Sequence, residues 1–146
     1  MKILVCIDLS DSTEEILKTI ERLCQPLKAK IWLLHNAMPE PDTIKFKVDP
    51  IEARASLAKE FHHQHRQIQE LAKQLRQSGI EATALLVHGK TIDVILTEAA
   101  DLDIDLIVVG SHGHGSMYHL LVGSVSEGVL HRSSRPVLVV PTHERD

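Results

Sequence analysis

Short apolar runs alternate along this chain with longer stretches whose apolar residues recur at helical spacing. In runs such as Lys2–Ile7 (KILVCI) and Ile104–Val109 (IDLIVV), apolar residues stand at almost every position. Strands of this kind are buried on both faces, which is typical of a parallel sheet. Parallel strands need crossover connections, and the helical stretches between the runs can provide them. We therefore predict an α/β protein whose parallel sheet is covered by helices on both faces.

The predicted elements follow from these runs and from turn and capping signals. Capping boxes at Ser12–Glu15 and Ser124–Glu127 mark the starts of two helices, the first of which ends near Pro26. Prolines punctuate a loop of about a dozen residues before the helix Ile51–Gln77. A further helix is centred on Ile92, Ile95, Leu96 and Ala99. The predicted strands are Lys2–Ile7, Lys30–His35, Glu81–Val87, Ile104–Val109 and Pro136–Val140.

Composition narrows the class of protein. A length of 146 residues fits one domain, which we expect to cover residues 1–146. The net charge of -4 argues against nucleic-acid binding, and no apolar run reaches the roughly 18 residues that span a bilayer. The first residues do not resemble a signal peptide. Cys6 and Cys24 make no disulfide framework, so we expect buried, inert thiols in a cytoplasmic protein without membrane contact.

Glycines cluster after the fourth predicted strand. Gly110 and Gly113 follow that strand directly, and Gly123 precedes a predicted helix start. Ligands of parallel α/β sheets bind beyond the carboxyl ends of the strands, where the Gly110 segment begins. The first amides of a helix are unpaired and carry partial positive charge, so Gly123 would let an anion approach them. Ser124 and Ser126 can add hydroxyl donors. The segment predicts a phosphate site built largely from backbone.

The spacing Gly110, two residues, Gly113, nine residues, Gly123-Ser124 resembles the ATP-binding signature of the universal stress protein family, G-x2-G-x9-G-[ST]. The resemblance covers the whole chain. It implies a single-domain, Rossmann-like three-layer sandwich with a five-stranded parallel sheet in the order 3-2-1-4-5. The other stretches that carry it are KILVCIDLSDSTEEIL, IWLLHNA, DLDIDLIVVGSHGHG and RPVLVVP.

The resemblance also implies roles for individual residues. Asp8 would accept hydrogen bonds from the ribose or the adenine edge. Asn36 stands where the family usually has Val, whose backbone contacts adenine; the change keeps that backbone but alters the apolar wall beside the base. Cys6 replaces a Pro that is common in the nucleotide-binding branch. Val109, Gly110, His112 and Gly113 would line the ribose and phosphates, and the triphosphate end would be held by Gly123, Ser124, Val125 and Ser126.

Three functions remain open at this point. The segment Gly110–Gly128 contains no Lys or Arg, which phosphoryl transfer usually requires, so we expect ATP to be bound and turned over slowly or not at all. ADP or AMP could replace ATP, with or without Mg²⁺. The alternatives are a slow ATPase or autophosphorylating protein and a nucleotide-free scaffold. The resemblance further implies a homodimer formed through Pro136–Pro141, acting in a stress response on a downstream protein that the sequence does not identify.

Two other motifs are interpreted as structural. Gly89-Lys90-Thr91 ends like a P-loop, but the glycine that should open the loop is Ala84. We expect Gly89 to turn the chain and Thr91 to cap a helix. His62 and His65 share a helix face without a third ligand in the pattern, so we expect no metal site there.

Overall fold

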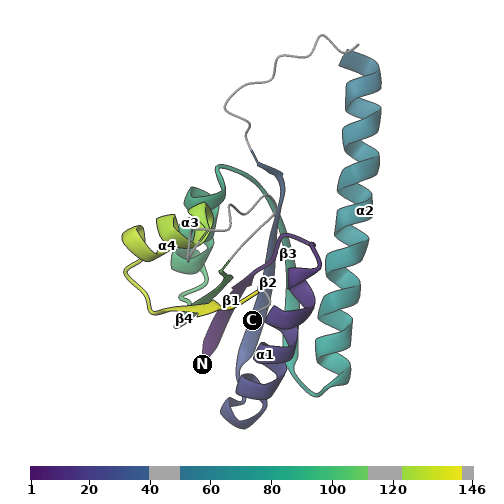
Figure 1. The fold of residues 1–146 in the computed structure, drawn as a ribbon. Coiled ribbons are helices and arrows are strands. Elements are labelled where there is room, and N and C mark those ends of the chain that lie inside the picture. Colours follow the sequence, from purple (N-terminus) through teal and green to yellow (C-terminus); the bar gives the residue numbers. More distant parts are fainter. Residues whose placement is uncertain (40–49, 112–122, 143–146) are drawn as a thin grey trace.

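The computed structural model describes residues 1–39, 50–111 and 123–142 and contains a five-stranded sheet (Figure 1). The strand order is β3-β2-β1-β4-β5, and every neighbouring pair is parallel. Both the parallel sheet and the order 3-2-1-4-5 are therefore confirmed. The strands are β1 (Lys2–Cys6), β2 (Lys30–Pro39), β3 (Glu81–Gly89), β4 (Leu106–Gly110) and β5 (Val137–Val140).

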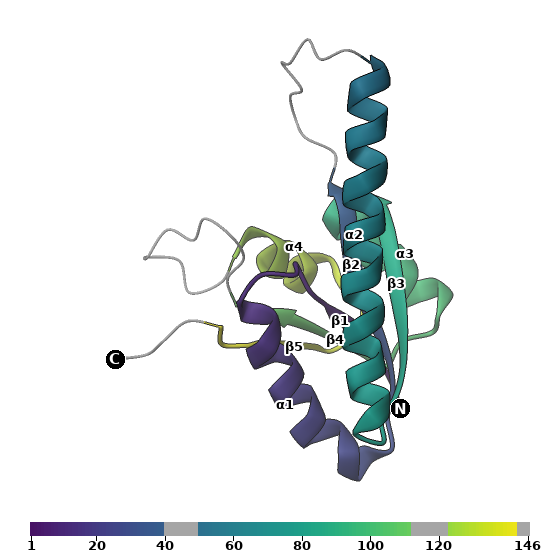
Figure 2. The same cartoon turned by 90° about the vertical axis from the view of Figure 1, so that its right-hand side faces the viewer.

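Helices cover both faces of the sheet, as Figures 1 and 2 show from two directions. One apolar cluster joins the sheet to α1 and α2, where Ile31 and Leu33 of β2 are fully buried. The other cluster joins the sheet to α3 and α4 and includes Leu34 of the same strand. Successive side chains of β2 thus point to opposite layers, as a pleated strand requires. The helices are α1 (Ser12–Leu27), α2 (Pro50–Gln77), α3 (Thr91–Asp101) and α4 (Ser124–Arg132).

Helix α2 is much longer than the strands it packs against. Its 28 residues span about 42 Å, and its N-terminal part extends beyond the sheet (Figures 1 and 2). Ile68, Ala72 and Leu75 are buried in the C-terminal half, whereas residues 55–63 are exposed. Within the described ranges, no helix is apolar enough over a sufficient length to cross a membrane.

Two strands extend further than the sequence predicts. β2 continues from His35 to Pro39, and β3 continues from Val87 to Gly89. The two strands stay paired beyond His35, with a register irregularity between Asn36 and Met38. Polar residues after an apolar run suggest a strand end, but pairing with a neighbour satisfies their backbone groups and prolongs the strand.

The predicted helix caps are wrong. Ser12 and Ser124 are the first residues of α1 and α4, and the N-caps are Asp11 and Gly123, neither with a side-chain cap hydrogen bond. In place of a box, the Ser10 hydroxyl donates to the carboxylate of Asp8 and is hydrogen-bonded to the hydroxyl of Ser12. Helix α1 ends at Leu27, next to Pro26, as predicted. The residue after it, Lys28, adopts a left-handed conformation, a common helix terminator.

Both cysteines are free thiols, and burial raises the pKa of each. Cys24 is buried in the first apolar cluster. Cys6 is half-buried against the second cluster, and desolvation raises its pKa to about 12. Since the thiolate is the reactive form, neither thiol should react readily at neutral pH. We expect the folded protein to react slowly with a thiol-specific chromogenic reagent at about pH 8. In the denatured protein, both thiols should react and give the full absorbance change. Rapid labelling of the folded protein would contradict this.

Candidate functional site

The sheet brings most of the predicted site residues to one edge. Asp8 follows β1, Asn36 lies in the last part of β2, and Gly110 ends β4. Because these strands are parallel and adjacent in the order β2-β1-β4, their carboxyl ends meet there. The first turn of α4 packs against the end of β4. Predicted residues His112 and Gly113 lie outside the described residues.

A tight turn fixes the position of Asp8. Leu9 has a φ of 59°, an uncommon conformation for a branched side chain, and reverses the chain between β1 and α1. In this turn, Oδ1 of Asp8 accepts hydrogen bonds from the Ser10 backbone N–H at 3.0 Å and from the Ser10 hydroxyl. Among the described residues, no partner is found for Oδ2 of Asp8. That oxygen can accept a hydrogen bond from a ligand at the edge of the sheet.

The start of α4 is tied directly to the end of β4. The Gly123 N–H donates to the carbonyl of Ser111, and the buried hydroxyl of Ser126 donates to the carbonyl of Gly110. Ser124 and Val125 are exposed. The amides of Ser124, Val125 and Ser126 lie in the first turn, where a helix offers no acceptor. No described residue accepts from these N–H groups, so the arrangement presents them and the positive end of a helix dipole beside the sheet edge.

Two further predicted residues lie on the face of the sheet that α3 and α4 cover. Val109 is 2% exposed, and Cys6 packs against the same apolar cluster. Gly110 faces the opposite layer, where a Cβ would lie 3.1 Å from both Ile16 and Thr142. The glycine therefore lets Ile16 of α1 and Thr142, which follows β5, lie close to the end of β4.

A polar network around Asn36 was not predicted. The Asn36 amide nitrogen donates to the carbonyl of Gly89 at 2.8 Å and to the hydroxyl of Thr91 at 2.9 Å. Gly89 turns the chain with a φ of 131°, as predicted, but Thr91 begins α3 and the N-cap is Lys90. The only sequence feature that points to this network is an Asn after an apolar run, and it does not indicate hydrogen-bond partners more than 50 residues away.

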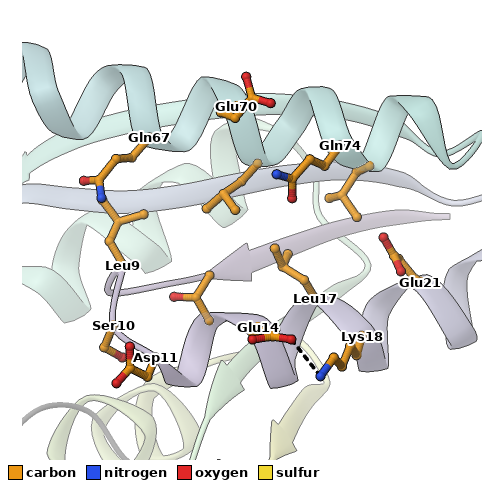
Figure 3. A pocket seen from close by; sticks show the side chains of 13 residues that line it. Leu9, Ser10, Asp11, Glu14, Leu17, Lys18, Glu21, Gln67, Glu70 and Gln74 are labelled. Atoms are coloured by element: carbon orange, nitrogen blue, oxygen red, sulfur yellow. Dashed lines mark ion pairs between the residues drawn. The ribbon is translucent and has the colours of Figure 1, made fainter.

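A groove of about 690 Å³ lies between α1 and α2 and is lined at one end by Leu9 and Ser10 of the turn after Asp8 (Figure 3). Leu17 lies at its centre, and carboxylates such as Glu14 and Glu70 lie along its sides. The ammonium of Lys18 is engaged by Glu14 at 2.8 Å and by Glu15 at 3.5 Å. The groove is therefore apolar inside and acidic at its border.

The groove is also lined by Thr13, whose buried hydroxyl finds no hydrogen-bond partner in the described part of the chain. A buried, unpaired polar group is destabilising, so an isosteric apolar side chain should be better tolerated. We expect Thr13→Val to raise the free energy of unfolding by about 1 kcal/mol in urea denaturation. The matched control is Thr19→Val on the same helix, because the exposed Thr19 hydroxyl already donates to the carbonyl of Glu15. An equal or larger gain from Thr19→Val would contradict the explanation.

Within the ranges that the structure describes, no group of three or more His, Cys, Asp or Glu residues is arranged to hold a metal ion. The polar groups at the edge of the sheet are the backbone N–H donors of α4 and two acceptors, the Asp8 carboxylate and the Asn36 amide oxygen. Such groups suit a ligand with an anionic end and polar groups further along.

A parallel sheet in the order 3-2-1-4-5 between two helical layers, with a helix start at its carboxyl edge, defines a Rossmann-like α/β protein. The chain belongs to the universal stress protein family, whose family model matches residues 1–141. It is 30% identical to universal stress protein MJ0577 of Methanocaldococcus jannaschii, over 95% of this chain and 93% of that protein. A solved structure of MJ0577 superposes with a TM-score of 0.84 at 29% identity, covering 99% of this chain and 97% of that one.

More distant members share the fold. UspA from Lactobacillus plantarum has a TM-score of 0.81 at 22% identity, covering 96% of this chain and 97% of its own. Two further relatives were solved with adenine nucleotides. A universal stress protein in complex with cAMP has a TM-score of 0.67 at 22% identity, covering 98% of both chains. The complex of the Archaeoglobus fulgidus protein with dAMP has a TM-score of 0.63 at 21% identity, covering 96% of this chain and 97% of that one.

Proposed function

We propose that this protein binds ATP at the carboxyl edge of the sheet and acts as a nucleotide-dependent regulatory module in a stress response. The observation that carries the proposal is the α4 start, which Gly123 and Ser126 anchor to the end of β4. Its free first-turn amides suit phosphate oxygens. The complexes of two relatives with cAMP and dAMP support an adenine nucleotide as the ligand.

Different described residues would contact the phosphates and the ribose of the nucleotide. Phosphates would be bound by the backbone amides of Ser124, Val125 and Ser126. The Ser126 hydroxyl already donates a hydrogen bond to the carbonyl of Gly110, so this residue would contribute its backbone N–H to the phosphates. The free oxygen of Asp8 would accept from the ribose. Mg²⁺ could accompany the phosphates, and ADP or AMP would fit the same contacts with fewer phosphate oxygens.

Slow hydrolysis or autophosphorylation is the second candidate. Catalysis of phosphoryl transfer requires a positioned base or water and cationic groups on the transferred phosphate. The Glu127 carboxylate lies 3.7 Å from a ring nitrogen of His131, away from a capping role, and both side chains are largely exposed. The segment from Gly110 to Gly128 carries no Lys or Arg, which favours retention of ATP over turnover. A nucleotide-free scaffold is the third candidate, and the position of the α4 start at the carboxyl edge of the sheet counts against it.

The proposal is tested by identifying what the purified protein carries. Protein prepared without added nucleotide is denatured, and the released small molecules are identified by chromatography and mass spectrometry. Near-stoichiometric ATP would support retention without turnover. Released ADP or AMP would favour slow hydrolysis or a different preference, which a turnover assay with Mg²⁺ would separate. If nothing is released and titration calorimetry detects no binding of ATP, ADP or AMP, the proposal is wrong.

We also propose a homodimer through Pro136–Pro141, because β5 is an edge strand with one unpaired side. The carbonyls of Pro136 and Val140 accept from β4, so by alternation the N–H of Val139 points outward. Two copies of β5 related by a two-fold axis would pair these free groups. We expect light scattering at micromolar concentration to give twice the 16.3 kDa chain mass.

The matched test of the interface is Val139→Pro. Proline removes an outward N–H and leaves the hydrogen bonds to β4 intact, so the variant should remain folded and become monomeric. Leu138→Pro is the contrasting variant, because its N–H points toward β4 and its loss should destabilise the fold. A wild-type monomer, or a Val139→Pro dimer of unchanged affinity, would contradict the interface.

A further inference from the structure

The Asn36 side chain carries a buried acceptor without a partner. Asn36 is 9% exposed, and its amide nitrogen donates to Gly89 and Thr91. Its Oδ1 atom is buried and has no hydrogen-bond partner among the residues that the structure describes. Buried polar atoms are almost always paired, so an unpaired one at the edge of a candidate site points to a donor supplied by a ligand.

The orientation of the Asn36 amide is fixed by its neighbours. The carbonyl of Gly89 can only accept, so the nitrogen must face it at 2.8 Å. A flipped amide would place Oδ1 against that carbonyl oxygen, where neither atom can donate, whereas the Thr91 hydroxyl could bond either amide atom. The free atom is therefore an acceptor and not a donor. Since both N–H groups are engaged, Asn36 can recognise a ligand only through Oδ1.

The strand order places Asn36 where a base would lie. Asn36 follows Leu34 by two residues and shares its side of the sheet, toward α3 and α4. Asp8 follows the neighbouring strand β1, and the α4 start adjoins β4. Adjacent strands are about 4.8 Å apart, so β4 and β2 are separated by roughly 10 Å. A nucleotide with phosphates at α4 and ribose at Asp8 therefore reaches β2 with its base.

We propose that Asn36 is a specificity-determining residue that selects 6-aminopurine nucleotides by accepting a hydrogen bond from the exocyclic amine at Oδ1. A 6-oxopurine would bring its carbonyl oxygen against the same acceptor and would leave Oδ1 unpaired. Sites that hydrogen-bond one ligand group discriminate strongly against an analogue that lacks it. This inference rests on the proposed binding of a nucleotide at the sheet edge.

The test compares ATP with inosine triphosphate (ITP), which replaces the 6-amine by a 6-oxo group. In calorimetric titrations, wild-type protein should bind ATP at least about tenfold more tightly than ITP. Asn36→Val should weaken ATP binding, leave ITP binding nearly unchanged and bring the ratio close to one. Thr91→Val is the matched control, because it removes one partner of the Asn36 nitrogen and leaves Oδ1 and the Gly89 bond in place. It should keep the preference for ATP.

The outcomes separate this inference from the function on which it rests. If wild-type protein binds neither ATP nor ITP, the proposed function fails, and the inference with it. If it binds both equally, nucleotide binding stands and the role of Asn36 is overturned. A retained preference in Asn36→Val overturns it as well. Thermal unfolding of both variants checks the fold, and the wild-type ratio decides the question even if Asn36→Val does not fold.

Discussion

Gly123→Val should abolish ATP binding while the protein remains folded. Gly123 is the N-cap of α4, with φ −69° and ψ 162°, an extended conformation that Val adopts without strain. The added side chain would stand before the first-turn amides and keep phosphate oxygens away. Losing two or more charge-assisted hydrogen bonds should raise the Kd for ATP by at least about 100-fold. Calorimetric titration measures the Kd, and urea denaturation should show a change of less than about 1 kcal/mol.

Lys90→Val is the matched control for Gly123→Val. Lys90 is the N-cap of α3, also extended at φ −71° and ψ 117° and also without a side-chain cap hydrogen bond. The same side chain is thus placed at an equivalent position of a helix that we do not assign to the phosphates. Its effect on ATP affinity should be within about threefold, under 1 kcal/mol. If Gly123→Val keeps wild-type affinity, the assignment of phosphates to α4 is wrong.

Gly128→Val should destabilise the protein through the contact between α3 and α4. A Cβ at Gly128 would lie 2.2 Å from Cδ1 and 3.1 Å from Cγ1 of Ile92, so a side chain here requires Ile92 to change rotamer or α4 to shift. The overpacking should lower the free energy of unfolding by about 1–3 kcal/mol, although Val is a slightly better helix former than Gly. Urea denaturation measures the change. Displacement of α4 should also weaken ATP binding, because its first turn would shift.

A double-mutant cycle with Ile92→Ala checks the cause. Removing the Ile92 side chain beyond Cβ deletes the atoms that clash, so Gly128→Val should cost little in that background. The coupling between the two positions should then be comparable to the cost of Gly128→Val alone. The same cost in both backgrounds would show that the loss arises elsewhere, for example in the helix backbone.

Much of the fold was predictable because it depends on local periodicity. The apolar runs around Val5 and Val108 required strands buried on both faces, and the intervening helical spacing required a parallel sheet. Element centres were therefore correct, whereas several ends were not. The ends of β2 and β3 depend on pairing between distant segments, and the start of α1 depends on the turn around Asp8 and Ser10.

The order of elements, the buried faces and the glycine spacing that resembles a nucleotide-binding signature all follow from local residue patterns. Which polar groups are satisfied and which are free depends instead on how the folded segments meet. The nitrogen of Asn36 is engaged by residues more than 50 positions away, and the Ser126 hydroxyl is taken by Gly110. The close fit of Gly128 against Ile92 is likewise set by packing. Hydrogen-bond partners and steric clearance depend on distances between segments remote in the chain, and residue type and local spacing do not encode those distances.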